Sequence, residues 1–229
     1  MTAYFGPKYR ADQGNSRRFK YFRPLIEAAG GAKTILEVGA WAGASLAAWD
    51  SAAESKAKLL VIDFWQPYFP HGGENYDVMT DAAKSGEIFD LFNANVASCG
   101  MTDRVEVFRG DSKVILPALA SIMFGQIDVA FIDGDHRYEG ALADIKNTAC
   151  LIREGGILCG DDLELTLGGV SDLAAHRRAI DRGDDVDETN KYHPGVTQAV
   201  ADVFGTVSVF EGLWAVQKVG NDWKEVRLT

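Results

Sequence analysis

Short apolar runs alternate with segments of helical periodicity along most of the chain. The runs predict strands at 34–38, 58–63, 105–109, 127–133 and 156–160. Between them, apolar residues recur at helical spacing, which predicts helices at 16–29, 45–53, 84–98, 112–121 and 138–153. Strands that are apolar throughout are typical of a parallel sheet covered on both faces. Their alternation with helices predicts a doubly wound α/β fold.

The C-terminal part of the chain breaks this pattern. Residues 196–204 predict a helix, and 206–210 and 213–219 predict strands with only Glu211 and Gly212 between them. A two-residue link predicts a hairpin, so the last strand should run antiparallel to its neighbour. We therefore predict a seven-stranded sheet that is mostly parallel and ends in a C-terminal hairpin.

The length of 229 residues favours a single domain over 1–229. Residues 1–30 predict an N-terminal helical segment. The segments 64–83 and 163–195 predict long loops, the second polar and acidic and therefore a mobile lid. We expect both loops to shape a substrate pocket.

The composition limits the kinds of molecule that the protein is expected to bind and the compartment where it is expected to act. The net charge of −10 argues against nucleic acid or an anionic membrane as a partner, because a negative surface repels phosphates. No apolar run approaches the ~20 residues that span a bilayer, and the N-terminus lacks the apolar segment of a signal peptide. Cys99, Cys150 and Cys159 have no metal-type spacing, so we expect reduced thiols and a cytoplasmic protein. Self-association into a homo-oligomer is left open.

A glycine-rich turn follows the first strand, in the sequence LEVGAWAGAS at 36–45. Such a turn lets a ligand approach the backbone and a helix N-terminus. A dinucleotide-binding turn would have glycine where Trp41 and Ala44 stand, and no Gly-Lys-Ser/Thr of a P-loop follows. The turn suits a smaller anion such as a carboxylate, with Ser45 as donor. A purely structural turn is the alternative.

Acidic residues also end the second and third strands. Asp63 can accept hydrogen bonds from a ribose diol. Asp111, in Gly110-Asp111-Ser112, can face an adenine amino group or can simply cap the helix that follows.

Four carboxylates follow the fourth and fifth strands: Asp133, Asp135, Asp161 and Asp162. The ends of adjacent parallel strands meet at one edge of a sheet, so these groups would repel one another without a cation. Oxygen ligands without cysteines favour Mg²⁺, Mn²⁺ or Ca²⁺. The alternative is that these acids cap the following helices and turns.

His136 lies among these acids and is the natural general base, because imidazole titrates near neutral pH. A solvent-facing histidine is the alternative, and Asp135 is the rival base. His71 and His193 are weaker candidates, and His176 is expected at the surface.

Together these residues resemble the class I S-adenosylmethionine-dependent methyltransferases. More closely they resemble metal-dependent small-molecule O-methyltransferases, namely the catechol O-methyltransferase-like group and the macrolide-sugar O-methyltransferases. The resemblance runs from about residue 34 to 219 and implies a Rossmann-like sheet. It implies Asp133, Asp161 and Asp162 as metal ligands. The residues that it implies around the cofactor are Glu37, Gly39, Ala40, Trp41, Gly43, Ser45, Asp63, Phe64, Gly110, Asp111, Ser112 and Asp133.

The resemblance implies methyl transfer from S-adenosylmethionine to a hydroxyl of a small molecule, with Mg²⁺ (or Mn²⁺ or Ca²⁺). Catechol-type enzymes carry a lysine base where this chain has His136, which favours a sugar or other alcohol over a catechol as acceptor. The base is His136 or Asp135, unless the ion alone activates the acceptor. Two rivals are a nicotinamide-dependent oxidoreductase, which Trp41 opposes, and a non-catalytic binding module, which the intact acids oppose.

Overall fold

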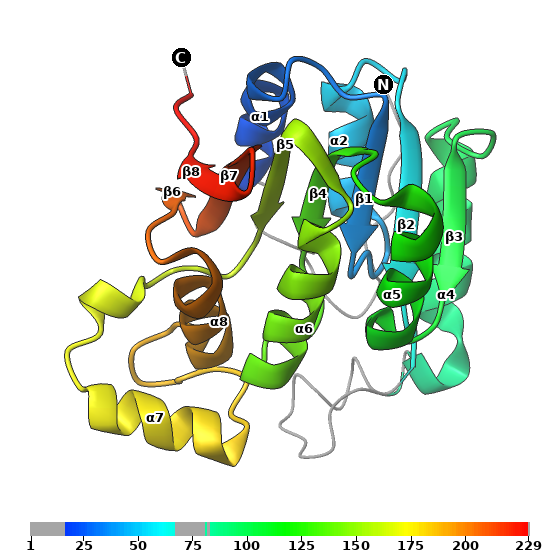
Figure 1. Cartoon of the computed structure of the whole chain (residues 1–229). Coiled ribbons are helices and arrows are strands. Elements are labelled where there is room, and N and C mark those ends of the chain that lie inside the picture. Colours follow the sequence, from blue (N-terminus) through cyan, green and yellow to red (C-terminus); the bar gives the residue numbers. More distant parts are fainter. Residues whose placement is uncertain (1–16, 67–80, 82, 229) are drawn as a thin grey trace.

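One mixed sheet organises the protein (Figure 1). The computed structural model describes residues 17–66, 81 and 83–228. The strand order is β3-β2-β1-β4-β5-β7-β6, and β8 also pairs with β7. Strands β1 to β5 are parallel, whereas β7 runs antiparallel to β5, β6 and β8. The strands are β1 Thr34–Val38, β2 Lys58–Asp63, β3 Val105–Arg109, β4 Ile127–Ile132, β5 Ile152–Gly160, β6 Ser208–Phe210, β7 Leu213–Val219 and β8 Asp222–Glu225. The predicted α/β class, with its antiparallel last strands, is confirmed.

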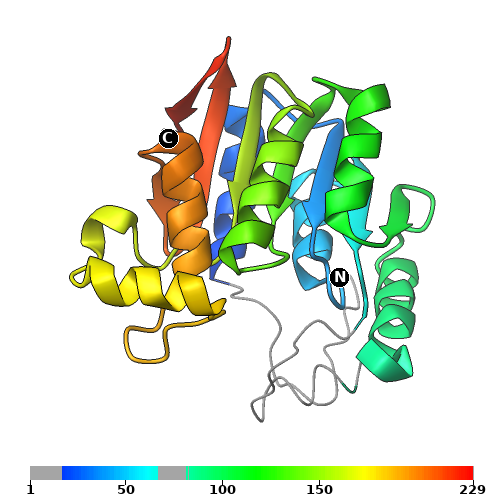
Figure 2. The ribbon, with the colours of Figure 1, turned by 60° about the horizontal axis from the view of Figure 1, so that its bottom comes forward.

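Helices cover both faces of the sheet (Figures 1 and 2). One apolar core joins the sheet to α1 (Phe22–Ala28), α2 (Ala44–Ala52) and α4 (Glu87–Ser98). The other core joins it to α5 (Ser112–Met123), α6 (Tyr138–Ala149) and α8 (Pro194–Phe204). Neighbouring strand residues contribute to opposite cores because side chains alternate across a strand. The remaining helices are η1 Arg18–Tyr21, η2 Leu167–Gly169 and α7 Leu173–Arg182.

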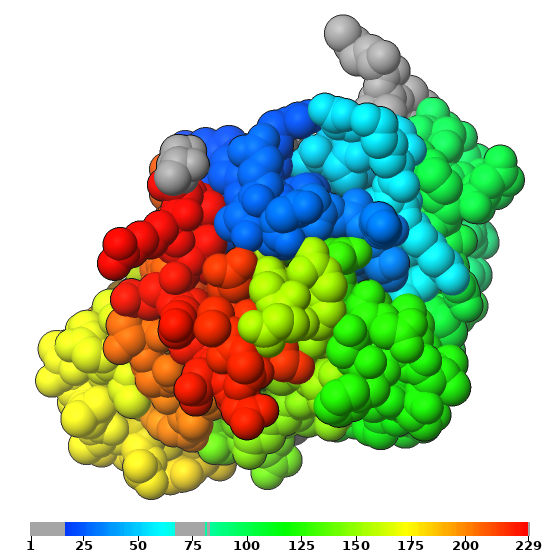
Figure 3. Space-filling view, turned by 45° about the horizontal axis from the view of Figure 1, so that its top comes forward, coloured from blue at the N-terminus to red at the C-terminus, as the bar shows by residue number. Residues whose placement is uncertain are grey.

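The predicted N-terminal helix is split into η1 and α1. The split places Pro24 in the first turn of α1, where its missing N–H costs no helical hydrogen bond. The end of α1 lies beside β5 and β7 on the face seen in Figure 3. There the Gln217 side chain donates to the Ala28 carbonyl at 2.9 Å, and Arg153 donates to the Ala29 carbonyl at 2.7 Å. These contacts fix the end of α1 against β5 and β7.

Some predicted boundaries were wrong. The helix predicted to end at residue 153 ends at Ala149, and β5 starts at Ile152 rather than at residue 156. Ile152 fits the spacing of apolar residues in a helix as well as in a strand. Its pairing with Ile127 of β4 places it in the sheet. The short strand β8 was not predicted, because its sequence DWKE has no apolar alternation. It forms because the chain turns back beside β7.

The segment predicted as a lid is partly helical. Within it, α7 begins at the capping residue Asp172, whose carboxylate accepts from the Ala175 N–H at 2.9 Å. The helix ends at Gly183, which has φ +71°. The high polarity of α7 hid it from the pattern of apolar residues. No helix among the described residues is long and apolar enough to cross a membrane, and all three cysteines are unpaired.

Candidate active site at the carboxyl edge of the sheet

The turn after β1 packs closely against the end of β4. Gly39 has φ +86°, and a Cβ at this position would lie 1.9 Å from the Asp133 carbonyl oxygen. Only glycine therefore allows the approach. Gly43, with φ +88°, is the N-cap of α2. The glycines of the turn thus bring the start of α2 next to the loop that carries Asp133.

Asp63 determines the shape of this turn. Its Oδ2 accepts from the backbone N–H groups of Ala40 and Trp41, each at 2.8 Å, and its Oδ1 accepts from the Trp65 N–H at 2.8 Å. Burial raises the pKa of this carboxyl, and these three hydrogen bonds oppose the rise. Phe64 beside it is 46% exposed. Asp63 therefore already has a structural role, and its predicted contact with a ribose stays a prediction.

Glu37 and Ser45 form a pair beneath the turn. Glu37 is fully buried, its Oε1 accepts from the Ser45 hydroxyl, and its Oε2 has no hydrogen-bond partner. Burial raises the pKa of Glu37 to about 8, against the opposing effect of the Ser45 hydrogen bond. The Ser45 hydroxyl is therefore directed at Glu37, and its predicted contact with a ligand carboxylate stays a prediction.

The loop after β3 is tied to α6. Asp111 is the N-cap of α5, and its carboxylate accepts from the Lys113 N–H at 2.9 Å. Gly110, with φ +158°, precedes it. The Ser112 hydroxyl donates to Oδ1 of Asp144 at 2.6 Å. The capping role considered for Asp111 is therefore present, and the adenine contacts stay predictions.

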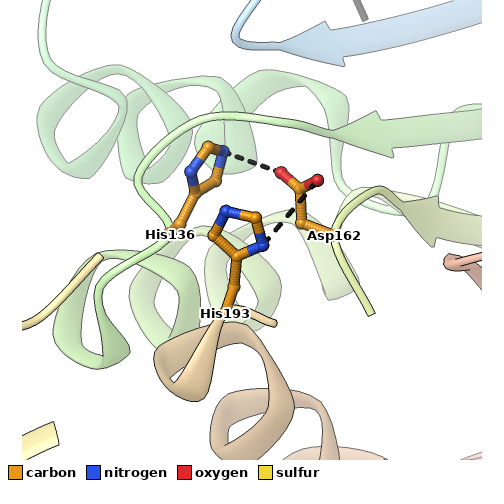
Figure 4. A group of neighbouring side chains, drawn as sticks. All are labelled: His136, Asp162 and His193. Atoms are coloured by element: carbon orange, nitrogen blue, oxygen red, sulfur yellow. Dashed lines mark ion pairs between the residues drawn. The ribbon is translucent and has the colours of Figure 1, made fainter. Parts of the chain in front are cut away.

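An acidic cluster forms where β4 and β5 end. The loop after β4 contributes Asp133 and His136, and the end of β5 contributes Asp161 and Asp162. Figure 4 shows the Asp162 carboxylate facing both His136 and His193, whose rings lie next to each other. His193 is the residue just before α8. The ligand atoms of these three residues all lie within 4.8 Å of one another. Sequence reasoning had ranked His193 as a weaker candidate.

The two ring nitrogens of His136 face different carboxylates. Nε2 lies 3.0 Å from Oδ2 of Asp162 and 3.6 Å from Oδ1 of Asp133. Nδ1 lies 3.1 Å from Oδ1 of Asp185. Nε2 is buried and makes no hydrogen bond of acceptable geometry. Burial lowers the pKa of His136, but the surrounding carboxylates outweigh it and raise the pKa well above its usual range.

Arg18, from η1, is the buried cation of this cluster. Its Nη1 pairs with Asp161 and lies 3.4 Å from Asp162, and its Nη2 pairs with Glu164 at 3.0 Å. Its Nε donates to the Glu211 carbonyl at 2.7 Å, and the Arg18 side chain is only 7% exposed. Asp161, a predicted metal ligand, is thus held by an arginine that belongs to no sequence motif.

Glu164 connects Arg18 to His193. Its Oε2 lies 3.2 Å from Nδ1 of His193, and its Oε1 accepts from Arg18. Burial opposes ionisation of Glu164, but the two basic neighbours outweigh burial and lower its pKa to about 2. Burial raises the pKa of Asp162, and His136 and His193 oppose that rise.

The other residues singled out in the sequence make different contacts. The Asp135 carboxylate forms a bidentate pair with Arg137, at 3.0 and 3.1 Å. The prediction that His176 lies at the surface was wrong: it is 2% exposed, and its ring nitrogens bond Tyr192 and Gln198. His71 lies outside the described residues.

Residues 36–163, more than half of the chain, match the sequence pattern of a family described as a methyltransferase domain. The chain belongs to this family. No curated protein matches the sequence.

Several solved structures of low sequence identity share this fold. An O-methyltransferase from Bacillus cereus in complex with SAH has 19% identity and a TM-score of 0.57, covering 91% of this chain and 84% of that one. TomG, an O-methyltransferase from Streptomyces achromogenes in complex with SAM, has 19% identity and a TM-score of 0.57, covering 91% and 82%. CalS11, a TDP-rhamnose 3′-O-methyltransferase, has 16% identity and a TM-score of 0.53, covering 88% and 79%. At these identities the likeness concerns the methyltransferase fold.

The buried position of Arg18 leads to a prediction about stability. Arg18→Met leaves the carboxylate of Asp161 buried without its cation, which should cost about 3–5 kcal/mol. Lys20→Met is the matched control: its pair with Glu211 is exposed to solvent and should contribute little to stability. Urea unfolding measures both. Equal stability of the two variants would contradict the assignment of Arg18 as the buried counter-charge.

Asp144 should make the stability of this methyltransferase depend on pH. Burial raises its pKa to about 7 in the folded protein, against about 3.9 in an unfolded chain. The folded state therefore holds the proton more tightly. The contribution of protonated Asp144 to the free energy of unfolding is fully present below pH ~4 and is lost as the pH rises to ~7. Asp144→Asn should thus gain stability over the wild type across this window, by up to about 1.4 kcal/mol per pH unit.

Urea unfolding of both proteins from pH 4 to 8 tests this prediction. Ser112→Ala should move the window to higher pH, because the Ser112 hydrogen bond lowers the pKa of Asp144. A constant difference between wild type and Asp144→Asn over the whole range would show that Asp144 does not titrate in this window.

Proposed function

We propose that this methyltransferase transfers a methyl group from S-adenosylmethionine to a hydroxyl of a small molecule, with a divalent cation in the acidic cluster. The observation that carries the proposal is the buried Nε2 of His136. This atom has no hydrogen-bond partner and faces Asp162 and Asp133, beside the turn that Gly39 brings against β4. Family membership supports methyl transfer, and the basic nitrogen among carboxylates supports a hydroxyl as the group that must lose a proton.

The cofactor is proposed to lie over the turn after β1. There the start of α2 offers free backbone N–H groups that suit the cofactor's carboxylate. Asp63, at the end of β2, is proposed to accept hydrogen bonds from the ribose, and Asp111 and Ser112 to line the adenine. The ends of β1, β2 and β3 are neighbours in the sheet, which supports one ligand extending across them.

The residues of the acidic cluster fit a divalent cation. Two carboxylates, Asp133 and Asp162, lie on the same side of the His136 ring, and their negative charges favour a cation between them. We propose Asp133 and Asp162 as ligands. Asp161 is the third proposed ligand, and its carboxylate would then be shared between the ion and Arg18. When bound, a divalent ion would lower the pKa of an acceptor hydroxyl and hold its oxygen in place.

Proton removal is assigned to His136. When bound, S-adenosylmethionine would supply an activated methyl group, and its sulfur would keep the electron pair of the carbon–sulfur bond as the acceptor oxygen bonded the methyl carbon. His136 would take the hydroxyl proton at Nε2, so that an imidazolium carries the positive charge that the sulfonium loses. Asp135 is the weaker base, because its carboxylate is already paired with Arg137.

The acceptor is proposed to be a sugar or another alcohol or phenol. His136 in the position where catechol-type enzymes carry lysine supports a sugar, and so does the likeness in fold to the TDP-rhamnose enzyme CalS11. The three unpaired cysteines support a reducing compartment, which we propose is the cytoplasm.

Asp63→Ala should weaken binding of S-adenosylhomocysteine at least about tenfold. The variant loses two hydrogen bonds to a charged group, each worth about 1.5–3 kcal/mol, and also the hydrogen bonds that shape the turn. Asp128→Ala is the matched control. Its carboxylate also accepts from two backbone N–H groups, but at the other end of β1. Calorimetry that gave both variants wild-type affinity would remove Asp63 from the cofactor site.

Methyl transfer should require a divalent cation. After exhaustive chelation the protein should be inactive towards TDP-rhamnose and catechol as probe acceptors, and Mg²⁺ or Mn²⁺ should restore activity. Mass spectrometry of the acceptor detects the added methyl group. Binding of S-adenosylhomocysteine should survive chelation, because its proposed contacts lie on other strands. Full activity with no detectable metal would contradict the proposed ion and return the acids to structural roles.

A further inference from the structure

Asp185 stands on the opposite side of the His136 ring from the acidic cluster. Its Oδ1 lies 3.1 Å from Nδ1, whereas Asp162 and Asp133 face Nε2. The Asp185 side chain is 17% exposed, so water competes weakly for its oxygens. A neutral imidazole whose Nδ1–H donates a hydrogen bond to a carboxylate has its lone pair on Nε2. The ring therefore lies between Asp185, which contacts Nδ1, and the acidic cluster, which faces Nε2.

The segment that carries Asp185 is firmly built. After Gly183 ends α7, the Asp184 N–H donates to the Ala179 carbonyl at 3.0 Å, and the chain turns back towards the loop after β4. A bridge between Asp187 and Tyr192 closes the following turn. The buried His176 then joins α7 to Tyr192 and to Gln198 of α8.

The start of α8 fixes the other side of this arrangement. A Cβ at Gly195 would lie 2.2 Å from the His136 carbonyl oxygen, so α8 packs directly against the backbone of His136. Both partners of the Asp185–His136 contact are thus positioned by packed backbone.

We propose that Asp185 is the positioning residue of His136: its carboxylate accepts a hydrogen bond from Nδ1–H and so keeps the lone pair on Nε2, the nitrogen that faces the acidic cluster. The consequence for proton transfer rests on the proposed function. The orientation is tested separately from the reaction, because Asp162 lies 3.0 Å from Nε2 and competes with Asp185 for the ring proton, and the tautomer can be observed without turnover. In the same way, a buried aspartate behind a catalytic histidine selects the tautomer in serine proteases.

Asp185→Asn is the decisive variant, because it preserves shape and removes the charge. The amide NH₂ can donate to Nδ1 and so favour the tautomer with the proton on Nε2. Nitrogen-15 NMR of the His136 ring, at a pH where the ring is neutral, should show the proton on Nδ1 in the wild type and on Nε2 in the variant. The kcat for methyl transfer to TDP-rhamnose or catechol should fall by roughly 10²–10⁴-fold, close to the loss in His136→Ala. Affinity for S-adenosylhomocysteine should change less than about twofold.

Two further variants separate positioning from general damage. Asp184→Asn removes the same charge one residue away, from a carboxylate paired with the exposed Arg182, and should behave as wild type. Asp185→Glu restores a carboxylate and should recover the Nδ1 tautomer together with part of the lost rate. An Asp185→Asn protein with the wild-type tautomer and rate overturns the proposal. A wild type that methylates neither probe while the NMR result holds refutes the proposed reaction for these acceptors and supports the orientation.

Discussion

The site is organised by a surplus of carboxylates at the edge where β4 and β5 end. Asp133, Asp161, Asp162, Glu164 and Asp185 approach one another there, and most of their charge is withdrawn from water. Buried charges persist only when they are compensated. Arg18 compensates one side of the cluster, and the two imidazoles stand on the other. The need for compensation explains why the first helical turn of the described chain, the loop after β4 and the start of α8 all converge on this edge.

This compensation also divides the cluster into two parts with different chemistry. Asp161 and Glu164 form ion pairs with Arg18, whose planar guanidinium can donate to several carboxylate oxygens at once. Asp133 and Asp162 face His136, whose Nε2 is left without a hydrogen-bond partner. Burying a polar atom without a hydrogen bond is unfavourable, so this atom invites a functional explanation. The Arg18 side thus holds the site together, and the His136 side is where chemistry can take place.

The shape of the glycine-rich turn is limited by backbone packing. The turn after β1 lies directly against the loop after β4. Gly39 allows this contact because its hydrogen takes the place of a Cβ that would overlap Asp133. Asp63 then holds the turn open by accepting its N–H groups. The same carboxylate therefore shapes the turn by itself, and it is also the acid that we propose for the ribose.

The sequence by itself determined the class of fold and the strand ends that carry chemistry. Strand-length apolar runs can be covered on both faces only in a sheet between helix layers, and residues that end parallel strands must share an edge. Asp63, Asp133, His136 and Asp162 could be singled out on that ground. Arg18, Glu164 and Asp185 could not, because they belong to no motif. Arg18 is 143 residues from Asp161 along the chain, and Asp185 is 49 residues from His136. Their roles arise from packing: η1 lies against Glu211, and α7 returns the chain to His136. Which acid meets which cation was decided only by the tertiary structure, since charge pairing depends on distance and burial, which a local pattern does not contain.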